Sequence, residues 1–185
     1  MGLQDYDKKE LQNKPFEGKQ VYYSGSIKGA PELEPDFAWQ LVQYMAEGGA
    51  DVLSEHVAAR NREEMDQIRA RRIGMEIQDM LAKPEPWLLI RKQDNEWVDQ
   101  ATHLVAVVNA PSHGVGMEIE RAILKPQRGL NETPILCLIH ETLLDKLSFM
   151  VRGVSEDEHP SFHLKTYTNL QEAQNTVHDF LIGNL

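Results

Sequence analysis

The sequence has a single cysteine, Cys137, which lies inside the apolar run PILCLI. One cysteine cannot form a disulfide within the chain, and its apolar neighbours favour a buried filler over a reactive nucleophile. This usage is typical of a reducing compartment, so we expect a cytoplasmic protein. The seven histidines are scattered, and no pair of them has the spacing of a metal site. We therefore predict no bound metal ion.

The sequence also lacks long hydrophobic runs and any excess of positive charge. No apolar run approaches the roughly 18 residues that cross a membrane, and the first residues are too polar for a secretion signal. Lys and Arg together number 19 against 29 Asp and Glu, which gives a net charge of −10. We therefore expect no binding to nucleic acid or to an acidic membrane. Amides and hydroxyls can still bind a small phosphate locally.

Strand-like and helix-like segments alternate along the 185 residues, a length that suits one domain. Residues 1–18 are interpreted as a loose tail and 19–185 as the domain. Strands are expected in QVYYSGSI, ADVL, HLVAVV, TPILCLIH and FHLKTYT, and helices at about 36–47, at 61–81, in LLIRKQDNEWVDQA, in GMEIERAILKP, in ETLLDKLSFMVRG and in NLQEAQNTVHDFLIGNL. The alternation and the continuous apolar inner strands predict an α/β, doubly wound, parallel sheet of five strands.

Polar residues follow three of the predicted strands, and binding sites in this fold class lie at the carboxyl ends of strands. The turn SGSIKG follows the first strand and can present amides, two hydroxyls and Lys28 to an anion. It is neither a P-loop nor GxGxxG, and a purely structural turn explains it equally well. SEH follows the second strand, and NAPSHGVGME follows the third.

Glu118 lies in the expected first turn of a helix that begins near Val115. There the helix dipole favours a carboxylate and lowers its pKa, which suits a nucleophile better than a general acid. On spacing alone, an ordinary helix-start glutamate is the simpler explanation. Asp94 and Glu96 in QDNEW are likewise explained as solvated helix residues, and RARR (69–72) as the solvated face of a charged helix.

The sequence resembles the nucleoside 2-deoxyribosyltransferase superfamily in five ordered blocks spanning roughly residues 20–167. The blocks are VYYSGSIKG, SEHVA, QDNEWVDQATHLVAVV, PSHGVGMEIERAI and LSFMVRG. They are most similar to the 2′-deoxynucleoside 5′-phosphate N-hydrolases, and the CMP N-glycosidases share the pattern. The resemblance implies a flavodoxin-like (Rossmann-type) sheet, a homodimer, and cleavage of the N-glycosidic bond of a nucleotide without a cofactor.

The resemblance also implies a role for particular residues. The glutamate of GVGxE is the family's nucleophile, the first-strand tyrosine orients it, and the aspartate of QDxEW assists the leaving base. These positions are Glu118, Tyr22 and Asp94. The residues implied to bind the 5′-phosphate are Ser26, Ile27, Lys28, Gly29, Ser112, Gly114 and, contributed across the dimer, Ser148. His56 in SEHVA is expected to lie at the pocket.

This chemistry requires few groups. A carboxylate can attack the oxocarbenium-like C1′ to form a glycosyl-enzyme, and a second acidic group can protonate the departing base. Transferases that act on free nucleosides carry an aspartate at position 112, which would repel a phosphate by about 1 kcal/mol or more. Ser112 is neutral and can donate a hydrogen bond, so it favours a nucleoside 5′-monophosphate.

The expected function is therefore hydrolysis of the N-glycosidic bond of (2′-deoxy)nucleoside 5′-monophosphates, with release of the base and (deoxy)ribose 5-phosphate. One alternative is a nucleoside 2-deoxyribosyltransferase that exchanges bases on deoxynucleosides. Another is a non-catalytic nucleotide sensor, which the combination of Tyr22, Asp94 and Glu118 disfavours. The sequence also departs from the family pattern. Lys28 replaces a frequent arginine, which weakens bidentate phosphate contact, and a helical insert at about 61–90 is interpreted as a lid or a determinant of base choice.

Overall fold

The computed structural model describes residues 13–26 and 33–185, and its centre is a sheet of five strands in the order β2-β1-β3-β4-β5. The strands are β1 (Gln20–Gly25), β2 (Asp51–Val52), β3 (His103–Val107), β4 (Ile135–His140) and β5 (Phe162–Tyr167). Every neighbouring pair is parallel. This order is that of the flavodoxin-like doubly wound folds, so the predicted fold class is confirmed.

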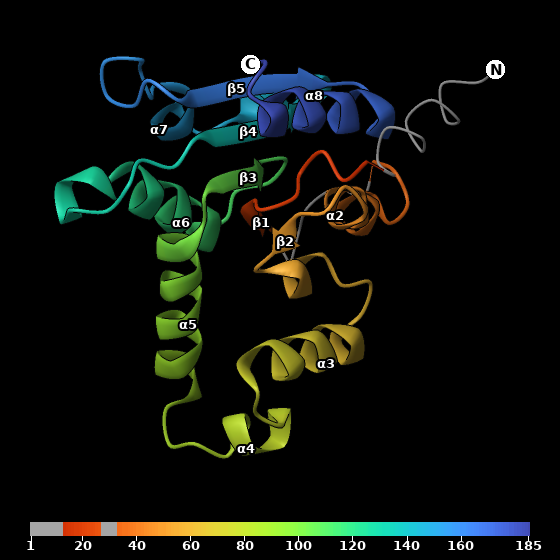
Figure 1. The fold of residues 1–185 in the computed structure, drawn as a ribbon, viewed down its shortest axis with the longest axis vertical. Coiled ribbons are helices and arrows are strands. Elements are labelled where there is room, and N and C mark those ends of the chain that lie inside the picture. The colour runs from red at the N-terminus through yellow and green to blue at the C-terminus, as the bar shows by residue number, and fades with distance from the viewer. Residues whose placement is uncertain (1–12, 27–32) are drawn as a thin grey trace.

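Helices cover both faces of the sheet, which is why the inner strands are apolar on both sides (Figure 1). One core contains side chains of α2 (Phe37–Glu47) and α8 (Leu170–Ile182), and the other contains side chains of α5 (Pro86–Gln100) and α6 (His113–Ile123). Tyr23 belongs to the first core and Tyr22 to the second. Successive residues of β1 therefore face opposite layers, as the period of a strand requires.

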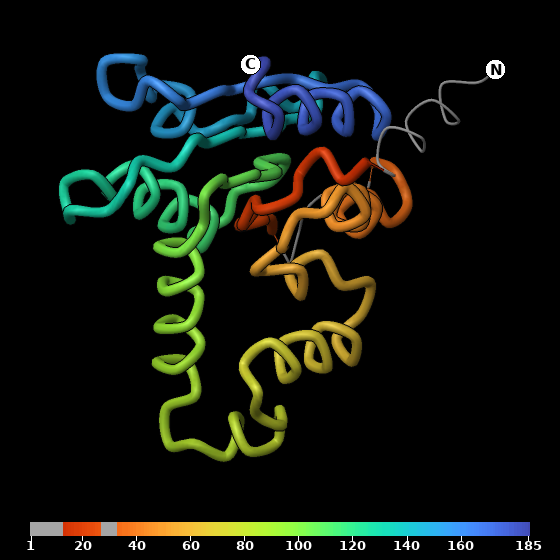
Figure 2. Tube along the Cα trace, viewed as in Figure 1, coloured from red at the N-terminus to blue at the C-terminus, as the bar shows by residue number. Residues whose placement is uncertain are grey.

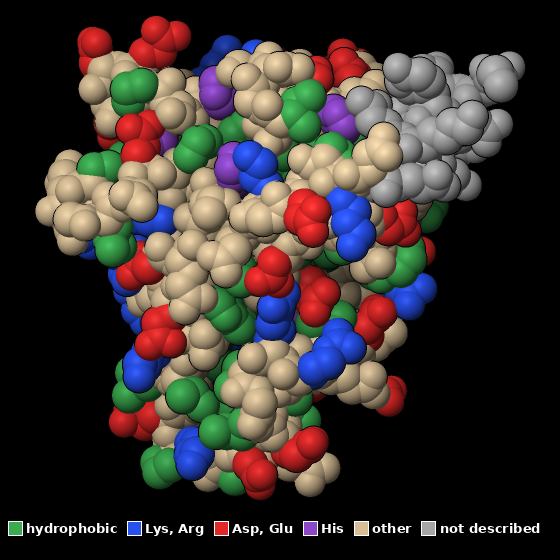
Figure 3. Space-filling model, in the orientation of Figure 1, with side chains coloured by type: hydrophobic (Ala, Val, Ile, Leu, Met, Phe, Trp, Pro, Cys, Tyr) green, Lys and Arg blue, Asp and Glu red, His purple; other side chains and the backbone are tan. Residues whose placement is uncertain are grey.

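The segment predicted as an insert forms α3 (Arg62–Ile73), α4 (Ile77–Leu81) and the first turn of α5. Figures 1 and 2 show these helices extending away from the sheet as an arm. The expected single helix is divided in two because Gly74 adopts a left-handed conformation, with φ 69°, and ends α3. None of the residues of α3 is buried, and acidic and basic side chains are intermixed over this part of the surface (Figure 3).

Short helical segments complete the chain. They are η1 (Glu55–Ala58), η2 (Pro126–Arg128), η3 (Glu141–Lys146) and α7 (Phe149–Arg152). None of the helices in the described ranges is long and apolar enough to cross a membrane.

The expected loose tail needs correction where the structure describes it. Phe16 is fully buried, and its ring lies 5.9 Å from that of Tyr44 and 5.3 Å from that of His178, centroid to centroid. Its amide donates to the carbonyl oxygen of Gly48 at 2.8 Å. Residues 13–18 are therefore fixed on the core by an aromatic anchor, and residues 1–12 lie outside the described part of the chain.

Candidate active site

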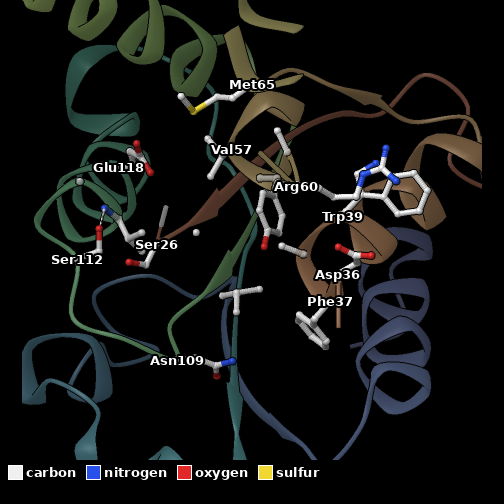
Figure 4. Close-up of a pocket in the computed structure, with 18 of the residues that line it drawn as sticks. Ser26, Asp36, Phe37, Trp39, Val57, Arg60, Met65, Asn109, Ser112 and Glu118 are labelled. Atoms are coloured by element: carbon white, nitrogen blue, oxygen red, sulfur yellow. Dashed lines mark hydrogen bonds between the residues drawn. The ribbon is translucent and has the colours of Figure 1, made fainter. Parts of the chain in front are cut away.

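A cavity of about 1150 Å³ opens at the carboxyl ends of β1 and β3. The chain leaves β1 toward β2 on one side, while β3 lies on the other side, so this is the point at which the strand order reverses. Ligands of doubly wound folds bind at such a point. The predicted site residues that line the cavity are Ser26, Asp94, Ser112, Gly114 and Glu118. Figure 4 shows Ser26, which follows β1, near Ser112 and Glu118 at the cap and in the second turn of α6.

Two hydroxyl groups hold the carboxylate of Glu118. The Tyr22 hydroxyl donates to Oε1 at 3.0 Å, and the Ser24 hydroxyl donates a short hydrogen bond to Oε2. Both donors are buried and lie two residues apart on β1, which places them on the same face of the strand. Both oxygens of Glu118 therefore have a fixed donor before any substrate arrives.

The pKa of Glu118 differs from the sequence-based expectation. The helix begins at His113 with Ser112 as its cap, so Glu118 lies in the second turn, beyond the reach of most of the dipole effect. Burial raises the pKa of this carboxyl group, and the hydrogen bonds from Ser24 and Tyr22 oppose the shift. The expected lowering of the pKa by the helix dipole is thus wrong, because desolvation outweighs the favourable groups.

Asp94 is the second acidic group of the cavity, and it comes from α5. Burial raises its pKa to about 6, the nearby Arg69 guanidinium opposes the shift, and the charge of Glu118 adds to it. Burial, together with Glu118, also raises the pKa of Tyr22, so the tyrosine remains a donor. The two carboxyl groups have different environments, and one of them is able to carry a proton close to neutral pH.

The other end of the cavity is formed by the start of α6. Ser112 caps this helix, since its hydroxyl oxygen accepts from the amide of Val115 at 3.4 Å. A methyl group added at Gly114 would lie 3.9 Å from the hydroxyl oxygen of Ser112 and 4.0 Å from Oε1 of Glu118. Gly114 thus keeps open the space between the helix cap and the carboxylate. Amides at a helix start, with a serine hydroxyl beside them, are suited to bind an anion.

Comparison with known proteins agrees with this geometry. No protein-family model matches the chain. A 5-hydroxymethyl-dUMP N-hydrolase from Rattus norvegicus is 34% identical over 136 residues, which cover 74% of this chain and 70% of the relative. Its counterpart from Homo sapiens is 33% identical over 136 residues, covering 74% of this chain and 66% of the relative.

The chain belongs to the family of nucleoside 5′-monophosphate N-hydrolases. Membership confirms the resemblance seen in the sequence and the expected class of enzyme, an N-glycosidase. The solved structure of a CMP N-glycosidase from Clostridium botulinum matches with a TM-score of 0.51 at 16% identity. That match covers 86% of this chain and 97% of the other, and it supports the flavodoxin-like fold.

The described lining of the cavity does not include the other predicted site residues of this N-glycosidase. Ile27, Lys28 and Gly29 fall outside the described residues. His56 is fully buried on η1, where a nitrogen of Arg69 lies 2.7 Å from its Nε2 atom. Ser148 is exposed at the cap of α7 and does not line the cavity. Any role of these residues in substrate binding stays a prediction.

The sequence-based reasoning missed Ser24 and Arg69. The signal for Ser24 was its spacing of two from Tyr22 on the same strand, which gives the two hydroxyls a common direction. Arg69 was interpreted as part of a solvated basic cluster, yet it lines the cavity, whereas its neighbour Arg71 is exposed. The distinction between these two arginines depends on which face of α3 is turned toward the cavity.

Within residues 13–26 and 33–185, no group of three or more His, Cys, Asp or Glu side chains is placed to hold a metal ion.

Proposed function

We propose that the protein hydrolyses the N-glycosidic bond of (2′-deoxy)nucleoside 5′-monophosphates through a covalent intermediate on Glu118. The observation that carries this proposal is a carboxylate with both oxygens hydrogen-bonded, in one cavity with a second carboxyl group, Asp94, whose pKa is raised to about 6. A glycosidase needs one ionised and one protonated carboxyl group. The family names of the relatives agree with this reaction.

In the first step a carboxylate oxygen of Glu118 forms a bond to C1′ while the bond from C1′ to the base breaks. The electron pair of the broken bond passes to the base nitrogen, and the carboxyl group of Asp94 gives its proton to the base. In the second step water attacks C1′, the Asp94 carboxylate accepts a proton from that water, and Glu118 leaves. The sugar keeps its configuration because C1′ is inverted twice.

Tyr22 and Ser24 act through the nucleophile. Both are donors aimed at the carboxylate of Glu118, and both are held by a buried strand. They fix the direction of attack without reorganisation at the moment of reaction. They also favour the ionised form of Glu118 and so oppose the rise in its pKa that burial causes.

The phosphate end of the substrate is assigned to the beginning of α6. Ser112 and the amides after it lie on the same wall as Glu118, and no carboxylate occupies position 112. A neutral donor next to a helix start accommodates a phosphate dianion. We therefore favour monophosphates over free nucleosides, which are the substrates of the alternative function, base exchange by a deoxyribosyltransferase.

We also propose a homodimer, located in the cytoplasm, in which α7 of one subunit reaches the cavity of the other. Phe149 is 85% and Met150 is 83% exposed, next to Ser148 at the cap of the same helix. Adjacent apolar side chains this exposed are suited to an interface. Phe149→Asp should yield a monomer by sedimentation velocity and lose activity, and a monomeric wild-type protein would contradict the dimer.

A panel of substrates tests the main proposal. The wild-type protein is incubated with the common ribonucleoside and deoxyribonucleoside 5′-monophosphates, and free base is measured by chromatography. Glu118→Gln should abolish base release but retain nucleotide binding in calorimetry, whereas Glu120→Gln, an exposed neighbour on α6, should behave as wild type. Base release by Glu118→Gln at the wild-type rate would refute the nucleophile.

The same protein should then be tested with deoxynucleosides and a free acceptor base. We expect no exchange. Efficient exchange with nucleosides, without release of base from monophosphates, would establish the transferase instead.

A further inference from the structure

The arginines of the arm, together with Arg60 just before it, differ in whether a carboxylate neutralises them. Four of them lie within 4.0 Å of a carboxylate: Arg60 at 3.0 Å from Glu64, Arg62 at 3.9 Å from Asp66, Arg71 at 3.4 Å from Glu55 and Arg72 at 2.5 Å from Asp51. Arg69 has no such ion pair within the described part of the chain. Among these five arginines, Arg69 is therefore the one whose charge no carboxylate of the described residues neutralises by direct contact.

The polar contact of Arg69 with His56 does not compensate the charge of the guanidinium group. A guanidinium nitrogen lies 2.7 Å from Nε2 of His56, and burial lowers the pKa of His56 to about 3. The histidine is therefore neutral and accepts this hydrogen bond, since arginine has donors only. The Nε atom of Arg69 is buried and has no hydrogen-bond partner among the described residues. Such a donor is costly unless something else accepts from it.

Arg69 lines the same cavity as Asp94 and Glu118. Its charge lowers the pKa of Asp94 and of Tyr22, so it lies close to the reacting groups. Met65, one helical turn earlier on α3, shares its face of the helix and also lines the cavity. In the view of Figure 4, Met65 and Ser112 lie on opposite sides of Glu118. The wall formed by α3 is thus opposite the helix start assigned to the phosphate.

We propose that Arg69 is a catalytic residue that donates hydrogen bonds to the nucleobase and stabilises the negative charge that develops on it as the glycosidic bond breaks. The inference rests on the proposed function. When the bond from C1′ to nitrogen breaks, its electron pair spreads over the ring and its carbonyl oxygens. Asp94 supplies the proton to the base. Arg69 transfers no proton and instead donates a hydrogen bond to an acceptor atom of the ring. A fixed cation aimed at developing charge is an effective form of transition-state stabilisation.

The arm therefore has a chemical task in addition to lining the cavity. Because arginine is a donor without acceptor capacity, the wall at Arg69 favours bases that present a carbonyl oxygen or an unprotonated ring nitrogen to it. A base that presents an amino group at that point would leave two donors facing each other. Arg69 is thus expected to contribute to the choice of base as well as to the rate.

The test uses the full-length protein and three variants. Arg69→Met removes the donors at similar length, Arg69→Lys keeps the charge but not the planar group, and Arg71→Met is the matched control on the same helix, because Arg71 is exposed and does not line the cavity. The best monophosphate from the substrate panel is compared with ring-substituted analogues whose free bases are more acidic. Base release gives kcat/KM for each, and circular dichroism checks folding.

The expected result is a loss of roughly ten- to a hundredfold in kcat/KM for Arg69→Met on the natural base, the range of a charge-assisted hydrogen bond. The loss should shrink as the leaving base becomes more acidic, because a better leaving group needs less stabilisation. Arg69→Lys should recover part of the rate, and Arg71→Met should match wild type.

If Arg69→Met lost the same factor in kcat/KM on every analogue, whatever the acidity of its free base, Arg69 would have a structural role and the inference would be overturned. Unchanged kinetics in Arg69→Met would also overturn it, while leaving the proposed function intact. An inactive wild-type protein would instead refute the proposed function, and the inference with it, so the two failures are distinguishable.

Discussion

Replacing Ser24 with alanine removes one of the two donors to the Glu118 carboxylate and leaves the nucleophile itself in place. Ser24 is fully buried, so water does not take over the lost hydrogen bond freely. A hydrogen bond to a charged group contributes about 1.5–3 kcal/mol. The bond favours the ionised carboxylate, so its loss should raise the pKa of Glu118 further above the level already set by burial.

The direction of the kinetic effect follows from the roles of the two carboxyl groups. Activity requires Glu118 ionised and Asp94 protonated, so kcat/KM should rise with pH as Glu118 loses its proton and fall as Asp94 loses its proton, near pH 6. Ser24→Ala should move the rising limb to higher pH. The maximum of kcat/KM then falls, because a smaller fraction of the enzyme has Glu118 ionised and Asp94 protonated at the same time.

The free energy of unfolding should also depend on pH through the pKa of Glu118. In the folded protein Glu118 holds its proton more tightly than in the unfolded chain, so stability falls as pH rises from the ordinary pKa of glutamate through the folded pKa. Ser24→Ala raises the folded pKa further. The variant should therefore lose about 1.5–3 kcal/mol relative to wild type where Glu118 is ionised, and little from this source where it is protonated.

The assay is base release from the preferred monophosphate across the acidic and neutral pH range, with urea unfolding at the two ends of that range. Ser54→Ala is the matched control, because Ser54 is also fully buried and its hydroxyl donates to the neutral carbonyl of Tyr23 at 2.6 Å. The control should lose stability equally at every pH and keep both limbs. A rising limb that stays at its wild-type position in Ser24→Ala would refute the assignment of this hydroxyl to the nucleophile.

Three further predictions concern the same cavity. Asp94→Asn should remove the falling limb near pH 6 and lower kcat by roughly 10²- to 10⁴-fold, measured in the same pH profile. Gly114→Ala should fold normally but raise KM, because its methyl group would lie 4.0 Å from Oε1 of Glu118, whereas Gly116→Ala, with open space around it, should keep KM unchanged. Ser112→Asp should weaken monophosphate binding by about 1 kcal/mol or more in calorimetry. An affinity equal to that of the wild type would contradict the assignment of the phosphate to the start of α6.

The fold was predictable from the chain because its determinants are local. Continuous apolar strands alternate with amphipathic helices, and that pattern alone leads to a parallel sheet covered on both faces. The division of the arm into α3 and α4 was missed because a left-handed glycine cannot be distinguished from a helical one by composition. Phe16 was missed because a single aromatic residue in a polar segment carries no periodicity, although it is fully buried.

The sequence by itself showed which predicted strands are followed by polar segments. Through its resemblance to a known family, it also identified Glu118, Asp94 and Tyr22 as candidate site residues. Their meeting in space was decided by the strand order, which brings the ends of β1 and β3 together. The tertiary structure alone set the pKa values, since burial depends on residues distant in the chain and here outweighs the hydrogen bonds that Ser24 and Tyr22 donate to Glu118. The tertiary structure also showed that Arg69 lines the cavity whereas Arg71 does not, because the placement of the helix decides which side of a charged segment faces the cavity.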